Sequence, residues 1–98
     1  MSQHIAVVGA GIAGLTAAYY LKQYGYKITV YEASNRVGGR MTTDNINGCL
    51  IDRGAQFLSP YYSTLMPLIH EFNLESELVE ISPWVGIVRK NKIRRILT

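Results

Sequence analysis

The spacing of three glycines constrains the fold of this chain more than any other feature. Gly9, Gly11 and Gly14 form the pattern G-x-G-x-x-G directly after the apolar run "IAVV" at residues 5–8. Such a run predicts a buried strand of a parallel sheet. Over residues 11–24 apolar side chains recur at three- and four-residue spacing, which predicts a helix that begins inside the glycine motif. The motif therefore joins a strand to a helix, as in the first half of a β-α-β crossover.

Each glycine of the motif has a separate physical role. Gly9 permits a sharp exit from the strand, Gly11 lets a pyrophosphate approach the backbone, and Gly14 lets the helix lie close to the strand. The N–H groups near Ile12 and Ala13 have no acceptor within the helix and attract an anion, as does the helix dipole. The motif predicts a phosphate-binding loop.

The segment after the helix completes the crossover. Residues 27–31, "KITVY", are β-branched and aromatic, which predicts a second strand. A strand, helix and strand of this length favour parallel pairing and a right-handed connection. Glu32 ends that strand, where its carboxylate can accept hydrogen bonds from both hydroxyls of an adenosine ribose. It would repel a 2′-phosphate, so NADP is disfavoured, whereas NAD and FAD stay open.

A second glycine pair follows within a few residues. Gly38 and Gly39 lie between Arg36 and Arg40 in "RVGGR", and adjacent glycines weaken a regular strand. They allow the backbone to press against a second part of a ligand, and the fork of donors on Arg40 suits phosphate oxygens. A ligand that contacts both loops must be long and anionic. FAD meets this description, whereas NAD would leave the second loop without a clear role.

The rest of the chain predicts two hairpins and a short helix. Asn47-Gly48 suits the positive φ angles of a type I′ hairpin turn, and a second turn is expected at Asn91. Pro67 is tolerated in the first turn of a helix, where its missing N–H has no partner to lose. The expected elements are a strand pair at 41–46 and 49–52, a helix at 65–72 and a strand pair at 84–89 and 92–97.

Composition restricts the class of protein. The 98 residues, 48% hydrophobic and 17% charged, suit one small globular domain. The net charge of +3 comes from the cluster "RKNKIRR", which is interpreted as a solvated hairpin and not as a nucleic-acid site. Cys49 is the only cysteine, and a zinc-type Cys/His cluster is absent. Neither a signal peptide nor an apolar run long enough to span a bilayer is present, so a cytoplasmic protein is predicted.

Three stretches of sequence carry a resemblance to a known superfamily. The stretches "VVGAGIAGLTAAYYL", "VYEASNRVGGRMTT" and "IDRGAQF" occur in this order across residues 5–57. With them the chain resembles the N-terminal FAD-binding segment of the flavin-containing amine oxidase superfamily. That group includes monoamine and polyamine oxidases, renalase-like proteins, protoporphyrinogen oxidase and phytoene desaturase. Beyond residue 57 the match is loose.

The resemblance implies roles along an FAD molecule. The positions implied to surround the pyrophosphate are Gly9, Gly11, Ile12, Ala13 and Gly14. Those implied at the adenosine are Glu32 and Ala33 beside the ribose, and Arg36 near the same half. Those implied at the phosphate and ribityl region are Gly39 and Arg40. Those implied to approach the flavin ring are Gly54, Ala55, Gln56 and Phe57, with Asp52 bracing their loop. No metal is implied, and no catalytic residue is assigned within the chain.

The resemblance also implies an incomplete α/β fold. Residues 1–98 would be the N-terminal part of a Rossmann-like FAD-binding domain, a βαβ unit with an added antiparallel hairpin, from a larger two-domain flavoprotein. Residues 41–57 would form the hairpin and the flavin-ring loop, and the substrate domain would lie outside the chain. The whole protein would move a hydride from an amine or a related small molecule to the flavin, whereas this chain alone would be inactive.

The sequence is also compatible with two other functions, and the incomplete sheet favours self-association. The chain could be an NAD-binding dehydrogenase segment, or a non-catalytic nucleotide-binding or interaction module. A parallel sheet of two strands with one uncovered face is poorly stabilised, and its free edges can pair with another chain. Self-association is therefore predicted.

Overall fold

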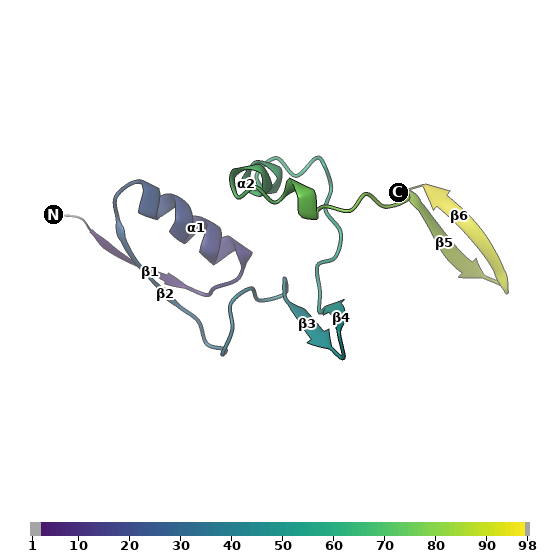
Figure 1. Cartoon of the computed structure of the whole chain (residues 1–98), viewed down its shortest axis with the longest axis horizontal. Coiled ribbons are helices and arrows are strands. Elements are labelled where there is room, and N and C mark those ends of the chain that lie inside the picture. The colour runs from purple at the N-terminus through teal and green to yellow at the C-terminus, as the bar shows by residue number, and fades with distance from the viewer. Residues whose placement is uncertain (1–2, 98) are drawn as a thin grey trace. The chain divides into compact units, whose positions relative to one another are not determined.

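A computed structural model describes residues 3–97, which divide after Phe57 into two compact units (Figure 1). The elements of the first unit are β1 (His4–Val8), α1 (Ile12–Gln23), β2 (Lys27–Tyr31), β3 (Thr43–Ile46) and β4 (Cys49–Asp52). Those of the second unit are α2 (Leu65–Glu71), a 3-10 helix (Glu75–Glu77), β5 (Trp84–Arg89) and β6 (Lys92–Leu97). The mixed α/β composition agrees with the predicted fold class.

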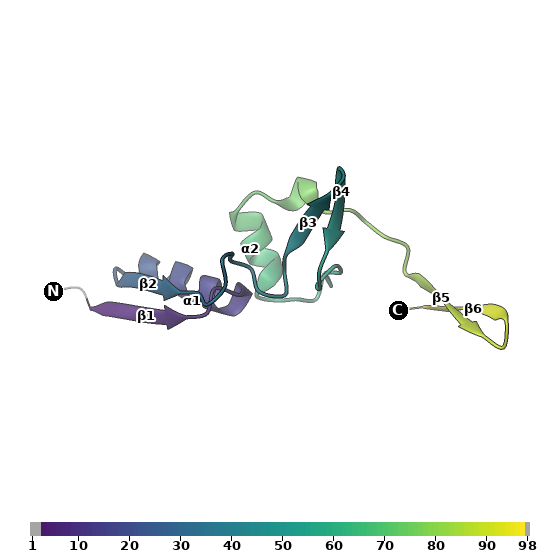
Figure 2. The same ribbon diagram turned by 90° about the horizontal axis from the view of Figure 1, so that it is seen from below.

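The predicted crossover is present in the first unit. β1 and β2 pair in parallel, in a register that begins with His4 opposite Lys27. Figures 1 and 2 show α1 along one side of this pair. The contact is close because a Cβ atom placed on Gly14 would lie 3.4 Å from Cγ1 of Val7, so Val7 faces the helix. The predicted role of Gly14 in helix–strand packing is confirmed.

The helix begins without any capping side chain. Gly11 is the N-cap residue of α1, in an extended conformation, and neither a side-chain cap nor an acidic residue satisfies the first turn. The first N–H groups of an α-helix have no partner inside it. The start of α1 therefore presents unpaired donors at the first glycine loop.

Within the described part of the first unit, no element covers the other face of the β1–β2 pair. Val8 and Tyr31 are neighbours in the register and are 86% and 59% exposed. Ala10, just beyond β1, is by contrast 1% exposed. Both faces of a parallel sheet are normally covered. Here the sheet has two strands and the residues of one face are exposed, so the predicted uncovered face is confirmed.

The first hairpin has the predicted turn and a shorter first strand. Asn47 and Gly48 both have positive φ angles, of 52° and 82°, as a type I′ turn requires. The prediction that the strand begins at residue 41 is wrong, because β3 begins at Thr43. Met41 belongs to a tight turn instead: its N–H donates to the carbonyl oxygen of Gly38 at 3.0 Å.

The second unit contains the predicted helix and the predicted second hairpin. α2 accommodates Pro67 in its first turn and buries Leu68 and Ile69. β5 and β6 pair antiparallel, and their turn has positive φ angles at Lys90 and Asn91. Every residue of the two strands is exposed, in agreement with a solvated hairpin.

Two negative findings concern residues 3–97. No helix in this range has both the length and the apolar character that crossing a bilayer requires. The same range holds no group of three or more side chains suited to binding a metal ion.

Candidate cofactor site

The two glycine loops of the sequence are in direct contact. The N–H of Gly38 donates to the carbonyl oxygen of Ala10 at 2.8 Å, and Gly11 and Gly38 form an isolated parallel bridge. A Cβ atom on Gly39 would lie 3.4 Å from the Cα of Gly11. Gly38 has a φ of 111°, and a Cβ there would lie 2.9 Å from the carbonyl oxygen of Met41. The second pair thus consists of glycines because it packs against the first loop and turns sharply.

A third backbone segment lies against the second loop. Arg53 N–H donates to the Thr42 carbonyl oxygen at 2.8 Å, and Ala55 N–H donates to the Arg40 carbonyl oxygen at 3.2 Å. A Cβ atom on Gly54 would lie only 2.4 Å from that same Arg40 oxygen. Any larger residue at position 54 would push the two segments apart. The residues after β4 are therefore held by backbone contacts to the loop before β3.

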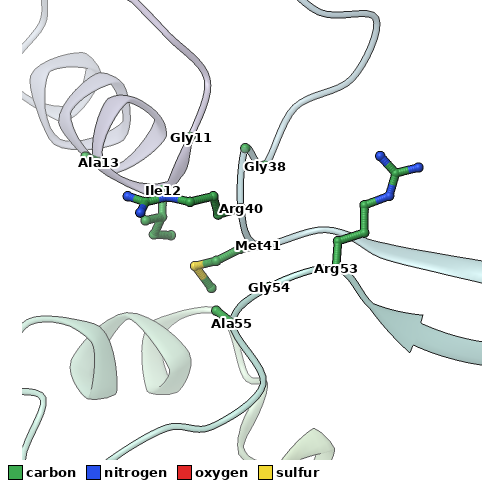
Figure 3. Close-up of a pocket in the computed structure, with 10 residues that line it drawn as sticks. Gly11, Ile12, Ala13, Gly38, Arg40, Met41, Arg53, Gly54 and Ala55 are labelled. Carbon is green, nitrogen blue, oxygen red and sulfur yellow. The ribbon is translucent and has the colours of Figure 1, made fainter.

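These three segments line an open-sided cavity of about 680 Å³ (Figure 3), within the range common for ligand pockets. Its lining residues are Gly11, Ile12, Ala13, Gly38, Gly39, Arg40, Met41, Arg53, Gly54 and Ala55. All belong to the first unit. The predicted site residues that the structure brings together here are Gly11, Ile12, Ala13, Gly39, Arg40, Gly54 and Ala55.

The cavity has the properties of an anion cradle. A Cβ atom on Gly11 would meet no atom within 4 Å, and its φ of −75° is open to any residue. A side chain at Gly11 would therefore only fill the cavity. Beside it, Ile12 and Ala13 begin an uncapped helix, whose free N–H groups and dipole favour negative charge. These features fit the diphosphate of a dinucleotide such as FAD.

One arginine supplies the charge of the cavity. Figure 3 shows the Arg40 side chain extended toward Ile12 at the start of α1, whereas Arg53 points away. Arg36 and Arg53 both form ion pairs with Asp44, at 2.8 and 2.6 Å. Within residues 3–97 the Arg40 guanidinium has neither a hydrogen-bond nor an ion-pair partner. It is thus free to bind an anionic ligand, with the fork geometry that phosphate oxygens prefer.

Glu32 lies outside the cavity lining and ties the first loop to the end of β2. Its Oε1 accepts a hydrogen bond from the N–H of Ala10 at 2.9 Å, and its Oε2 accepts one from the N–H of Ser34 at 2.8 Å. The Ser34 N–H, followed by that of Ala10, lowers the pKa of the Glu32 carboxyl below its ordinary value. The carboxylate is therefore ionised at neutral pH, and each oxygen keeps a lone pair for a further donor.

Several predicted residues do not line the cavity. Arg36 is paired with Asp44, and Phe57 is 69% exposed. Ala33 and Gln56 are also exposed. Gly9 and Gly14 lie behind the lining: Gly9 has a φ of 98°, and a Cβ on Gly14 would lie 1.9 Å from the Gly9 carbonyl oxygen. Their predicted contacts with a cofactor stay predictions.

Three lining residues are absent from the predicted site. Gly38, Met41 and Arg53 each adjoin a predicted residue. The signal for Gly38 was its place in the glycine doublet. Met41 was assigned to a strand. Arg53 lies within the stretch "IDRGAQF" that carries the resemblance, but no role was predicted for it.

Asp52 makes the kind of contact expected of a bracing residue. The hydroxyl of Thr43 donates a hydrogen bond to Oδ1 of Asp52, and the two residues are opposite each other in the β3–β4 register. Asp52 therefore supports the hairpin from which the third cavity segment leaves.

Comparisons with known proteins support the interpretation of the cavity as part of a flavin-binding site. The family model of flavin containing amine oxidoreductases matches residues 12–95. Putrescine oxidase from Kocuria rosea is 40% identical over 76 residues, which is 78% of this chain and 16% of that protein. Protoporphyrinogen oxidase 2, chloroplastic/mitochondrial, from Arabidopsis thaliana is 39% identical over 75 residues, 76% of this chain and 15% of that protein.

A solved structure agrees in fold. Wild-type putrescine oxidase bound to putrescine aligns over 100% of this chain and 22% of that chain, with a TM-score of 0.71 and 29% identity. The chain thus spans about a sixth of the length of the curated relatives named above. The description of the matching family, flavin containing amine oxidoreductase, agrees with the predicted flavin cofactor. The chain belongs to the flavin-containing amine oxidoreductase family.

Proposed function

We propose that this chain binds FAD as the N-terminal part of a Rossmann-like cofactor domain in an FAD-dependent oxidoreductase of the amine-oxidase type. The observation that carries the proposal is the cavity between three backbone segments. At its centre the open position of Gly11 adjoins an uncapped helix start, and the unpaired guanidinium of Arg40 lies close by. Family membership adds support, because the family is flavin-containing.

The phosphates of FAD would lie against the first and second loops. The N–H groups of Ile12 and Ala13 would donate to phosphate oxygens, and Arg40 would neutralise part of their charge. Gly9 and Gly14 would shape this loop from behind, and Gly39 would give close access to the ribityl region. Each of these groups binds or orients the cofactor.

The two ends of the cofactor would be held by residues on either side of these loops. Glu32 would accept hydrogen bonds from the ribose hydroxyls, with Ala33 beside it and Arg36 near the adenosine half. The flavin ring would approach the loop that follows β4, within residues 41–57. The residues proposed to lie near it are Gly54, Ala55, Gln56 and Phe57.

FAD, when bound, supplies the redox chemistry by accepting a hydride from the substrate. The residues of this chain position the cofactor, and the catalytic residues and the substrate domain are proposed to lie outside it, in a larger protein. The short share of each relative that the chain spans supports this view. On its own the chain is proposed to be inactive.

The substrate is proposed to be a small amine or a related molecule. The solved relative bound to putrescine supports an amine, whereas the name of the Arabidopsis relative indicates porphyrinogen oxidation. Both would use the same type of cofactor loop. A cytoplasmic location and self-association are retained as proposals.

The cofactor can be tested on the protein purified from the host that encodes it. We expect a yellow protein, or an apoprotein that quenches the fluorescence of added FAD and gives no response to NADH. A Gly11→Ala variant should keep the wild-type circular dichroism spectrum and lose this quenching. A colourless protein that is indifferent to FAD would overturn the proposal, and a response to NADH alone would favour the dehydrogenase alternative.

A further inference from the structure

Asp44 of β3 joins three separate segments through one carboxylate. Its Oδ1 accepts from Nη1 of Arg36 at 2.8 Å, and its Oδ2 accepts from Nε of Arg53 at 2.6 Å. Nη2 of Arg36 also donates to the carbonyl oxygen of Thr43 at 3.3 Å. The loop after β2, the strand β3 and the segment after β4 are therefore connected at this point.

The contact lies directly behind the cavity wall. Arg53 precedes Gly54 and Ala55, which line the cavity. Figure 3 shows the Arg53 side chain directed away from the cavity. The wall is held against the second loop, because the Ala55 N–H donates to the Arg40 carbonyl oxygen at 3.2 Å. The backbone of Gly54 lies so close to the same oxygen that no Cβ would fit between them.

The Asp44 carboxylate also affects which guanidinium groups are available to a ligand, because it pairs with two of the three arginines nearby. Arg36, Arg40 and Arg53 lie in the segments around the cavity, and Asp44 pairs with Arg36 and Arg53. Its pKa is lowered, first by the hydrogen bond from Arg53 and then by that from Arg36. Arg40 is left as the unpaired cation beside the helix start.

We propose that Asp44 is a positioning residue for FAD. It holds the guanidinium groups of Arg36 and Arg53 outside the cavity and fixes the wall at residues 53–55, against which the flavin end of FAD would lie. This inference rests on the proposed function, because it takes FAD as the ligand of the cavity. The wall at 53–55 lies on the flavin side of that cofactor, whereas the helix start lies on its phosphate side.

The test compares Asp44→Asn with Glu80→Gln in the protein purified from its host. Glu80 is a charge-matched control because it is an exposed acid of the second unit and does not line the cavity. Binding of FAD is measured by fluorescence quenching and binding of ADP by calorimetry, and the flavin midpoint potential is measured on the loaded protein.

We expect Asp44→Asn to weaken FAD binding about tenfold and ADP binding less than about twofold, with Glu80→Gln within about twofold of wild type for both ligands. The midpoint potential should shift more in Asp44→Asn than in Glu80→Gln, because the first variant also releases two guanidinium groups. Arg53→Gln should reproduce the loss, and the double variant Asp44→Asn with Arg53→Gln should add little to it.

Two results would overturn the inference. One is wild-type FAD affinity in Asp44→Asn. The other is an equal loss for ADP and FAD, which would indicate general unfolding of the loop. If Asp44→Asn does not fold, Arg53→Gln carries the same comparison. If the wild-type protein itself fails to bind FAD, the proposed function fails, and this outcome is distinct from the other two.

Discussion

The backbone N–H of Gly38 donates to the carbonyl oxygen of Ala10 at 2.8 Å, although the two residues lie at the ends of different loops. Through this bond the second glycine pair is held against the first glycine motif. The two loops thus form one surface, with Gly11 and Arg40 both facing the same cavity. Substitution of its glycines and of its charged residues should therefore change cofactor binding in distinct ways.

Gly11 and Gly14 should respond to the same substitution in opposite ways. Gly14→Ala should lower the free energy of unfolding by about 1–3 kcal/mol, because the new Cβ would lie 1.9 Å from the carbonyl oxygen of Gly9. Gly11→Ala should stay within about 1 kcal/mol of wild type, because its Cβ would meet no atom within 4 Å. FAD binding should nevertheless be lost in Gly11→Ala. Chemical denaturation and FAD titration of both variants measure the two effects.

The contrary result would be informative. If Gly11→Ala binds FAD as tightly as wild type, the cofactor diphosphate does not lie against Gly11. If Gly14→Ala is as stable as wild type, α1 and the loop at Gly9 can separate without cost.

Arg40 should contribute most of the salt-sensitive part of FAD binding. Arg40→Ala should weaken binding about 10- to 100-fold, because it removes a hydrogen-bonding charge from a bound anion. Arg40→Lys should recover only part of the loss, since lysine lacks the planar fork. The dependence of the dissociation constant on ionic strength should be smaller in Arg40→Ala than in wild type.

A charge-matched control is available in the second unit. Arg94→Ala on β6 removes one exposed positive charge far along the chain from the cavity. It should leave both FAD affinity and its salt dependence unchanged. Equal losses in the two variants would show that net charge alone, and not the position of Arg40, determines binding.

The stability of the first unit should fall in acid through Glu32. Its N–H partners favour the charged form, so its folded-state pKa lies below the ordinary value of 4.5. For a lowered pKa, the stabilisation is fully present above the unfolded-state value and is lost as pH falls through the folded-state value. The thermal midpoint should therefore be flat at neutral pH and decrease below about pH 4.5.

Glu32→Gln isolates this contribution, since Asp44 also has a lowered pKa. The variant should have a lower thermal midpoint at pH 7 and a smaller decrease in acid than wild type. Identical pH profiles of the two proteins would exclude Glu32 as a source of the acid sensitivity.

The 98-residue chain should self-associate through the bare face and free edges of the β1–β2 pair. Val8→Lys places a charge on that face, where Val8 is 86% exposed, and should shift the chain toward monomer. Val79→Lys, at a residue that is 83% exposed in the second unit, is the matched control. Light scattering across a concentration series measures the change, and a clean wild-type monomer at high concentration would contradict the prediction.

The order and type of the α-helices and strands could be predicted from local sequence patterns, whereas the 3-10 helix at Glu75–Glu77 was not predicted. An apolar run, a glycine motif and a β-branched segment are local patterns, and they located β1, α1 and β2 to within a residue or two. Asn47-Gly48 specified its own turn, because few residue pairs accept two positive φ angles. The lining residues of the two glycine loops followed from local patterns, whereas Gly54 and Ala55 were predicted only from the resemblance to the amine oxidase superfamily.

Which loops and side chains are in contact depends on the three-dimensional fold. Residues from different segments are joined by the hydrogen bond from Gly38 to Ala10. The same holds for the ion pairs of Asp44 with Arg36 and Arg53. Their pairing depends on the path of the loop between β2 and β3, which no periodicity specifies. The same reason explains why β3 was predicted to begin too early. The sequence around Met41 is typical of a strand, but the Met41 N–H donates to the Gly38 carbonyl oxygen and closes a turn. A periodic sequence pattern depends on residues within one helix or strand. The ion-pair partner of a charged side chain depends on which elements the fold brings close together.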